Sequence, residues 1–374
     1  MIFCEKCFTN PEISSRIKYN SEEEINIILE KGDCPLCRNS NVYLYNTETR
    51  IMLNNIFNPV FEIFITEDDL PKNYPENEKK YFIDIIKSWD LFNPIINEKD
   101  ITEIIKNISK EYLKQKPNIL SRKVGILEKM NINAYSNIAL VKTFNWDNFV
   151  DELKTKNRFH TNLVNEKVLE SYCSYLEKRY KKGKIFYRGR IADNIKGFNI
   201  EEMNAPPFEL AKAGRVNAEG IRHLYLANDK KTTIHEVRAG AYDVITVGTF
   251  ELQKDVLIID FQQLNNINPF DDELNLLDYA INIEHLQKMN KEMSKTMRRG
   301  DRVLDYIPTQ YIADYIKSFQ DINQNPIYSG IEYQSTMNKD GFNMVAFYPN
   351  DFKCISVETV SVTDIQYDYN IIVK

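Results

Sequence analysis

The sequence predicts an α+β fold in its carboxy-terminal half, preceded by a small cysteine-bearing module and a mainly helical region. Three observations support this order. Two Cys-x-x-Cys pairs lie near the amino terminus, apolar residues then recur at helical spacing, and short β-branched or aromatic runs alternate with helical segments after residue 183. We therefore expect three domains, at residues 1–45, 46–182 and 183–374.

Four cysteines are expected to hold the first domain together. Cys4 and Cys7 form one Cys-x-x-Cys pair, and Cys34 and Cys37 form the other. Each pair spans one edge of a tetrahedron, so the doubled motif favours one structural zinc ion over a redox dithiol or two disulfides. Residues 1–45 also contain too few apolar residues to fold without a metal. The module is therefore predicted to be a metal-binding zinc ribbon.

The second domain is predicted to be helical from the spacing of its apolar residues. They recur three and four positions apart in two sets, Tyr81, Phe82, Ile85, Ile86 and Trp89, and Ile101, Ile104, Ile105, Ile108 and Tyr112. A further helix is expected from about residue 163 to 180.

The third domain is predicted to alternate strands with helices. Strands are expected at residues 184–187, 224–227, 244–250, 256–261, 344–348 and 355–360, bounded by Gly, Pro, Asn or Asp. Helices are expected at about 232–239, 272–297 and 309–319.

Composition and charge exclude several classes of function. The 48 basic and 54 acidic residues give a net charge of −6, so a nonspecific nucleic-acid surface is not expected and any anion site must be local. No apolar run approaches the roughly 18 residues of a membrane span, and the first residues lack the pattern of a signal peptide. A cytoplasmic location is therefore expected. No Walker A loop or dinucleotide-binding glycine fingerprint is present, which argues against nucleoside-triphosphate hydrolysis and a Rossmann redox site.

Several residues of the third domain suit the binding of a phosphate. Tyr187 ends a predicted strand that Arg188 and Arg190 are expected to continue, and a guanidinium meets phosphate oxygens two at a time. We expect only one of the two arginines to face inward; the alternative is a surface strand whose arginines pair with carboxylates. Arg215 and Asn217 lie in a turn-prone segment whose amides could cradle an anion, although Gly-Arg-x-Asn alone is a weak signal.

Three further candidates follow along the chain. Tyr225 lies in a Leu-Tyr-Leu-Ala strand, where the alternative is a core aromatic residue, and Glu236 lies in the next helix, where the alternative is a solvated glutamate. Ser335 precedes a predicted strand without the Gly-x-Ser-x-Gly elbow of an acyl-enzyme nucleophile. His235 and Glu236 do not begin a zinc-protease motif, because Ala239 stands where the second histidine is required.

The order of these segments resembles the RES domain, a family named for its Arg, Glu and Ser residues. The resemblance covers nearly all of residues 183–374, and the region before it resembles the HEPN-like domain often placed ahead of RES domains. It implies an ADP-ribosyltransferase-like fold and an NAD-degrading hydrolase, a glycohydrolase or phosphorylase, with NAD as the substrate. It also implies a toxin or defence effector of the toxin–antitoxin kind. An antitoxin or other macromolecular partner is then expected to act through residues 1–160, or those residues themselves restrain the enzyme.

The resemblance also implies roles for the candidate residues. The catalytic set is Arg188, Glu236 and Ser335, and the NAD-binding set is Tyr187, Arg190, Arg215, Asn217 and Tyr225. In this scheme Arg188 and Arg215 hold the diphosphate, and Tyr225 packs against nicotinamide. Glu236 stabilises the cationic sugar while Ser335 orients a ribose or the nucleophile. The alternatives are an ADP-ribosyltransferase that modifies a protein or nucleic acid, and a non-catalytic zinc-ribbon adaptor that binds a nucleotide.

Overall fold

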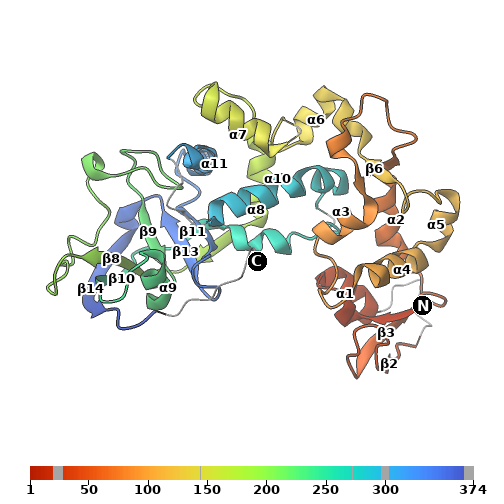
Figure 1. Cartoon of the computed structure of the whole chain (residues 1–374), viewed down its shortest axis with the longest axis horizontal. Coiled ribbons are helices and arrows are strands. Elements are labelled where there is room, and N and C mark those ends of the chain that lie inside the picture. The colour runs from red at the N-terminus through yellow and green to blue at the C-terminus, as the bar shows by residue number, and fades with distance from the viewer. Residues whose placement is uncertain (20–27, 144, 272, 296–302, 366–374) are drawn as a thin grey trace, which may run out of the picture. The chain divides into compact units, whose positions relative to one another are not determined.

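The structure is a computed structural model that describes residues 1–374 except 20–27, 144, 272, 296–302 and 366–374 (Figure 1). The chain divides into two compact units. The first consists of Met1–Lys142 and Asn265–Glu284, and the second of Thr143–Leu264 and His285–Lys374. The domain boundaries expected after residues 45 and 182 stay a prediction.

A small antiparallel sheet in the order β1-β3-β2 begins the first unit. Helix α1, Pro11–Lys18, starts after Asn10, whose side-chain oxygen accepts a hydrogen bond from the backbone of Ile13. Three carbonyl oxygens at the end of this helix accept hydrogen bonds from the buried side chain of Arg50. Side chains therefore satisfy both ends of α1. The strands are β1 Ile2–Cys4, β2 Lys31–Gly32 and β3 Val42–Asn46.

The rest of the first unit is mainly helical. The predicted periodicity is confirmed on α4, where four isoleucines at three- and four-residue spacing are buried. The segment 265–284 contributes Tyr279, which packs edge-on against Trp89 with ring centroids 5.1 Å apart. The elements are α2 Asn54–Glu62, α3 Phe82–Ser88, α4 Glu98–Ile108, α5 Lys110–Gln115, α6 Ile132–Ile138, β4 Ile65–Thr66, β5 Lys80–Tyr81 and β6 Lys123–Gly125.

An eight-stranded sheet in the order β14-β10-β8-β9-β13-β12-β11-β7 organises the second unit. Neighbouring strands are antiparallel except β11 and β12, which are parallel. The strands are β7 Glu177–Tyr180, β8 Ile185–Ala192, β9 Leu224–Ala227, β10 Val244–Leu252, β11 Val256–Asp260, β12 Gly330–Gln334, β13 Phe342–Ala346 and β14 Phe352–Ser361. The helices are α7 Trp146–Thr155, α8 Glu166–Tyr175, α9 Lys230–Glu236, α10 Leu276–Ser294, which begins in the first unit, and α11 Ile307–Ser318.

Three features in the middle of this sheet matter for function. One face is apolar, with Phe186, Leu226 and Phe250 in a single buried cluster. Helix α9 packs closely against β8, because a side-chain carbon on Gly189 would lie only 2.7 Å from Cγ2 of Thr233. Strands β8 and β9 are paired at one position alone, Tyr187 with Ala227.

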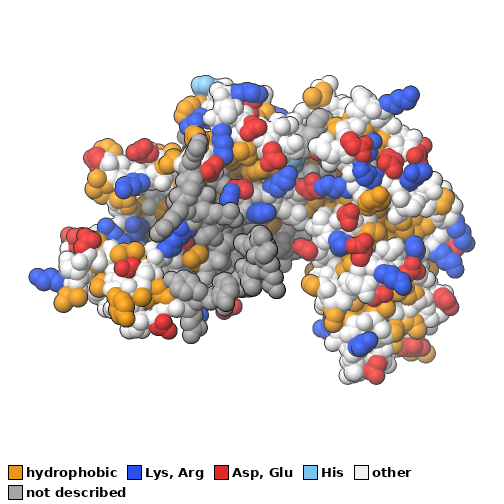
Figure 2. All heavy atoms as spheres, viewed as in Figure 1, with side chains coloured by type: hydrophobic (Ala, Val, Ile, Leu, Met, Phe, Trp, Pro, Cys, Tyr) orange, Lys and Arg blue, Asp and Glu red, His pale blue; other side chains and the backbone are white. Residues whose placement is uncertain are grey.

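The predicted mixed architecture is confirmed, with local differences. The helix expected to reach residue 180 ends at Tyr175, and Glu177–Tyr180 instead forms edge strand β7 against β11. Strand β12 was not expected. Parts of the helix expected over 272–297 lie outside the described residues. On the face shown in Figure 2, basic and acidic side chains are interspersed, as the nearly balanced composition predicts.

Candidate active site and metal centre

A cavity of about 230 Å³ lies beside the single pair that joins β8 to β9. Strands β8, β9, β12 and β13 and helix α9 all contribute to it. Its wall consists of Tyr187, Arg188, Gly189, Tyr225, Leu226, Ala227, Thr233, Glu236, Val237, Tyr333 and Asn343. Four of the eight predicted NAD-site residues are therefore in this wall: Tyr187, Arg188, Tyr225 and Glu236.

Arg188, which lines this cavity, carries an unused hydrogen-bond donor. Its Nη1 atom is buried and has no hydrogen-bond partner among the described residues. Burial, with a smaller effect from the charge of Arg190, lowers the pKa of Arg188 to about 10, so the guanidinium is still charged at neutral pH. A buried charged donor without a partner is unfavourable, and an anionic ligand would satisfy it.

Glu236 lies at the end of α9, with its carboxylate held from the sheet side. Its Oε1 atom accepts a hydrogen bond of 2.6 Å from the hydroxyl of Ser335 and one of 2.8 Å from the side-chain amide of Asn343. Its Oε2 atom makes no hydrogen bond within the described part of the chain, although the side chain lines the cavity. One oxygen is thus fixed while the other is available to a ligand.

Ser335 is 2 % exposed and does not line the cavity. Its single hydroxyl proton is donated to Glu236, and its oxygen accepts from the backbone N–H groups of Met337 and Asn338, both at 3.2 Å. This arrangement orients Glu236 and leaves the serine without the free proton and access that a nucleophile needs.

Asn217 closes the loop that follows the first candidate strand. Its amide nitrogen donates to the carbonyls of Lys212, Ala218 and Ile221, each at 3.0 Å, and its oxygen accepts a 2.6 Å bond from the hydroxyl of Tyr225. The side chain is 3 % exposed and is not in the cavity wall. Asn217 therefore holds Tyr225 and the loop together.

The other two arginines also lie outside the cavity wall. Arg190 packs over the ring of Phe198 at 3.9 Å and donates to the carbonyl of Glu202. Arg215 donates to the carbonyl of Met293 at 3.0 Å. Of Arg188 and Arg190 only Arg188 lines the cavity, although residues two apart in a strand leave the same face, so alternation along the strand is not what separates the two side chains.

Two polar residues of the wall were not predicted. Thr233 is 2 % exposed and its hydroxyl oxygen has no partner among the described residues. Asn343 is 8 % exposed and binds Glu236. The only local signal for Asn343 is an amide inside the otherwise apolar run Phe-Asn-Met-Val-Ala, which the structure places beside the cavity.

The four amino-terminal cysteines converge on one point. Their Sγ atoms all lie within 4.8 Å of one another, and three of the separations are 3.4, 3.6 and 3.9 Å. Zinc–sulfur distances of about 2.3 Å in a tetrahedron give sulfur separations of about 3.8 Å, which matches. The side-chain amide of Asn39 also donates to Cys37 at 3.1 Å, a contact typical of thiolate ligands. Cys4, Cys7, Cys34 and Cys37 therefore form a cluster that fits a metal ion.

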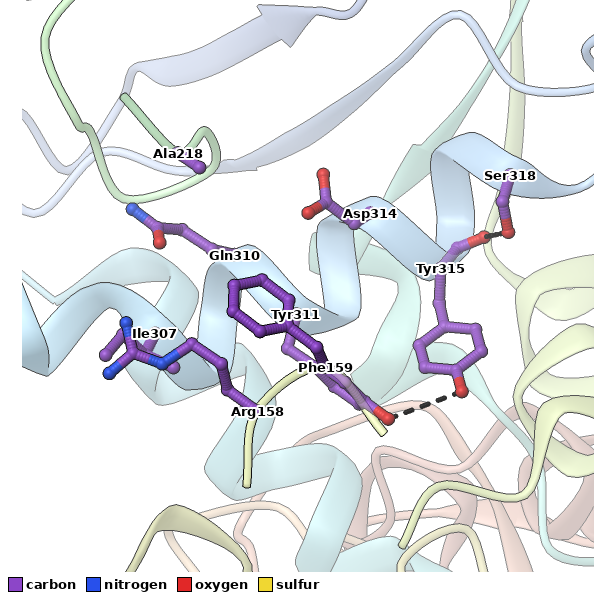
Figure 3. Close-up of a pocket in the computed structure, with 9 residues that line it drawn as sticks. All are labelled: Arg158, Phe159, Ala218, Ile307, Gln310, Tyr311, Asp314, Tyr315 and Ser318. Carbon is purple, nitrogen blue, oxygen red and sulfur yellow. Dashed lines mark hydrogen bonds between the residues drawn. The ribbon is translucent and has the colours of Figure 1, made fainter. Parts of the chain in front are cut away.

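A second and larger cavity, of about 370 Å³, lies along α11 (Figure 3). One face of that helix lines it, from Ile307 to Ser318, together with Arg158, Phe159 and Ala218. None of the predicted site residues is in this wall. The side-chain amide of Gln310 in this wall donates to the carbonyls of Gly214 and Asn217, so the helix supports the loop next to Tyr225.

Comparison with known proteins identifies the carboxy-terminal part of the chain. Residues 190–370 match the model of the RES domain, a span that includes Glu236, Ser335 and Asn343 and begins just after Arg188. Neither the curated proteins nor the solved structures contain a match to the chain. None of the described helices has the length and apolar character of a membrane span. A RES domain points to an NAD-related, toxin-like function. The carboxy-terminal part of this chain is a RES domain, preceded by a four-cysteine cluster consistent with a zinc ribbon.

Proposed function

We propose that the RES domain cleaves the bond between nicotinamide and ribose in NAD, in the cavity beside β8 and β9. The observation that carries this proposal is that Arg188 and Glu236 line the same cavity. Within the described part of the chain, the buried Nη1 of Arg188 has no hydrogen-bond partner, and Glu236 uses one carboxylate oxygen and leaves the other free. NAD offers both complements, a diphosphate for the guanidinium and a ribose for the carboxylate.

The chemistry follows from where charge develops. When the glycosidic bond breaks, its electron pair goes to the nicotinamide nitrogen, which becomes neutral, and positive charge appears on the ribose. Glu236 offers a negative oxygen whose position is already set by Ser335 and Asn343, so little reorganisation accompanies bond cleavage. The aromatic side chains of Tyr187 and Tyr225 supply apolar surface for the departing ring.

The acceptor of the ribosyl group decides between three outcomes. Water gives ADP-ribose, inorganic phosphate gives ADP-ribose 1″-phosphate, and a protein or nucleic-acid nucleophile gives an ADP-ribosylated macromolecule. The full-length protein is incubated with NAD labelled in its adenine ring, with and without phosphate and with a cell lysate. Released nicotinamide and the labelled products are then separated by chromatography.

The expected result is release of nicotinamide by the wild type and its loss in Arg188→Ala and Glu236→Gln proteins that remain folded. Label in a macromolecular fraction would assign the transferase reaction. Binding of NAD without release of nicotinamide would assign the non-catalytic adaptor and end the proposal.

We propose zinc as the metal of the four-cysteine cluster, because four thiolates at tetrahedral separations suit zinc. The toxin role, an antitoxin or other partner acting through residues 1–160, and the cytoplasmic location remain proposals of the same kind. Growth arrest on expression of the wild type, and its absence with Glu236→Gln, tests the toxin role. Relief of that arrest when a candidate antitoxin is co-expressed tests the partner.

A further inference from the structure

Asn343 occupies a rigid position next to the carboxylate of Glu236. It lies in β13, which is paired on one side with β12 and on the other with β9, and its direct neighbours are Tyr333 and Ala227. The side chain is 8 % exposed, lines the cavity and donates to Oε1 of Glu236 at 2.8 Å. A central strand moves less than a loop, so this amide is a fixed reference point.

The carboxylate of Glu236 requires hydrogen-bond donors to hold it in place. Glu236 is the last residue of α9, where the carbonyl ends of the helix disfavour a negative charge. The other donor to the same oxygen, Ser335, stands after β12 at the start of a turn that runs to Gly341. The two donors approach one oxygen from different elements, and only Asn343 is in the sheet itself.

We propose that Asn343 is a positioning residue that fixes Oε1 of Glu236 and thereby directs Oε2 toward the ribose of the substrate. This inference rests on the proposed NAD-cleaving function. It assigns the residue a role through Glu236, in the same way as Ser335, rather than direct contact with the reacting atoms. Its loss therefore affects the chemical step more than substrate binding.

Replacement by aspartate gives the sharpest test. Asn343→Asp has the same size but removes the donor and brings a second carboxylate to within hydrogen-bond distance of the first. Two carboxylates so close share one proton, and the shared proton restores a hydrogen bond between them. We expect at least a tenfold loss of kcat at pH 7.5 with KM changed less than threefold, and partial recovery as the pH falls toward about 5.5.

Two controls separate this role from general damage. Asn228→Asp adds the same charge nearby, but Asn228 acts as an acceptor for the backbone of Phe342 and its oxygen survives the change. Its pH profile is expected to follow the wild type. Asn343→Ala is expected to lose kcat without any recovery at low pH. An Asn343→Asp profile parallel to the wild type would overturn the assignment.

A measurement without NAD makes the inference independent of the reaction. The free energy of unfolding is compared for Asn343→Ala, Glu236→Ala and the double variant, with no nucleotide present. Non-additive effects show the bond between the two side chains, and additive effects would overturn the inference even if the wild type cleaves NAD. If the effects are non-additive but the wild type releases no nicotinamide, the proposed reaction fails, and with it the catalytic meaning of the bond.

Discussion

Arg188 and Arg190, two residues apart on one strand, should respond oppositely to the same substitution. Arg188→Met removes a guanidinium whose buried Nη1 has no hydrogen-bond partner among the residues that the structure describes. Arg190→Met removes one that packs on Phe198 at 3.9 Å and donates to a backbone carbonyl. The first change relieves an unfavourable burial, whereas the second removes contacts.

The size of the first effect follows from the desolvation of the charge. The pKa of Arg188 falls from 12.5 to about 10. At about 1.4 kcal/mol per pKa unit, this shift corresponds to roughly 3 kcal/mol for burying the charge. The side chain is partly exposed and its other N–H groups are less buried than Nη1, so we expect a net effect on the unfolding free energy of about 1–2 kcal/mol. For a unit of this size each kcal/mol changes the melting temperature by about 2–4 °C. Arg188→Met should therefore melt a few degrees higher than the wild type.

Ligand binding reverses the order. ADP-ribose, which carries the diphosphate but no nicotinamide, should raise the melting temperature of the wild type and not that of Arg188→Met, because the anion loses its partner. Differential scanning fluorimetry and calorimetry measure both effects. Arg190→Met should melt lower than the wild type without ligand. A lower melting temperature for unliganded Arg188→Met, or undiminished stabilisation of that variant by ADP-ribose, would show that Arg188 is not an unsatisfied cation that binds the diphosphate.

Three other predictions concern stability and metal content. Lys178 is the cation bound to two buried carboxylates, so Lys178→Met should cost about 3–5 kcal/mol of unfolding free energy by urea titration, whereas Lys181→Met, in an exposed pair, should change it little. Burial raises the pKa of Glu332 from 4.5 to about 7, so the folded state binds this proton more tightly than the unfolded state. The free energy of unfolding should therefore fall as the pH rises between those values. Glu332→Gln should remove this contribution from the dependence of the unfolding free energy on pH. Elemental mass spectrometry should find one zinc ion per chain in the wild type and none in Cys37→Ser. Cys173→Ser, changed at a buried cysteine outside the cluster, should keep its zinc. Equal zinc content in the two variants would contradict the zinc ribbon.

The sequence was most informative where local pattern decides structure. The Leu-Tyr-Leu-Ala run was predicted as a strand with the bounds Leu224–Ala227 that β9 has, and the cysteine spacing predicted a cluster that the fold assembles. Strand β12 was missed because Glu332 interrupts its apolar pattern, and the side chains that satisfy that buried charge, Lys178 and Tyr180, lie about 150 positions earlier. Edge strand β7 was predicted to be helical, because its charged and half-exposed residues lack the apolar alternation of a strand.

The site shows the same limit. The order of the motifs predicted that Arg188 and Glu236 share a site, and both line one cavity in the structure. The partners of Glu236 could not be read from the sequence, because Ser335 and Asn343 are 99 and 107 positions away. Spacing along a chain does not reveal which side chains share an oxygen, so the positioning of the carboxylate emerges only from the folded sheet.

The proposed reaction requires that one cavity hold both the diphosphate and the ribose of NAD. A crystal structure of Glu236→Gln with NAD tests it most directly, since the substitution preserves shape while slowing cleavage. We expect a phosphate oxygen within hydrogen-bond distance of Nη1 of Arg188 and the nicotinamide-bearing ribose beside position 236. A dinucleotide bound instead along α11, or lying with its phosphates away from Arg188, would contradict it.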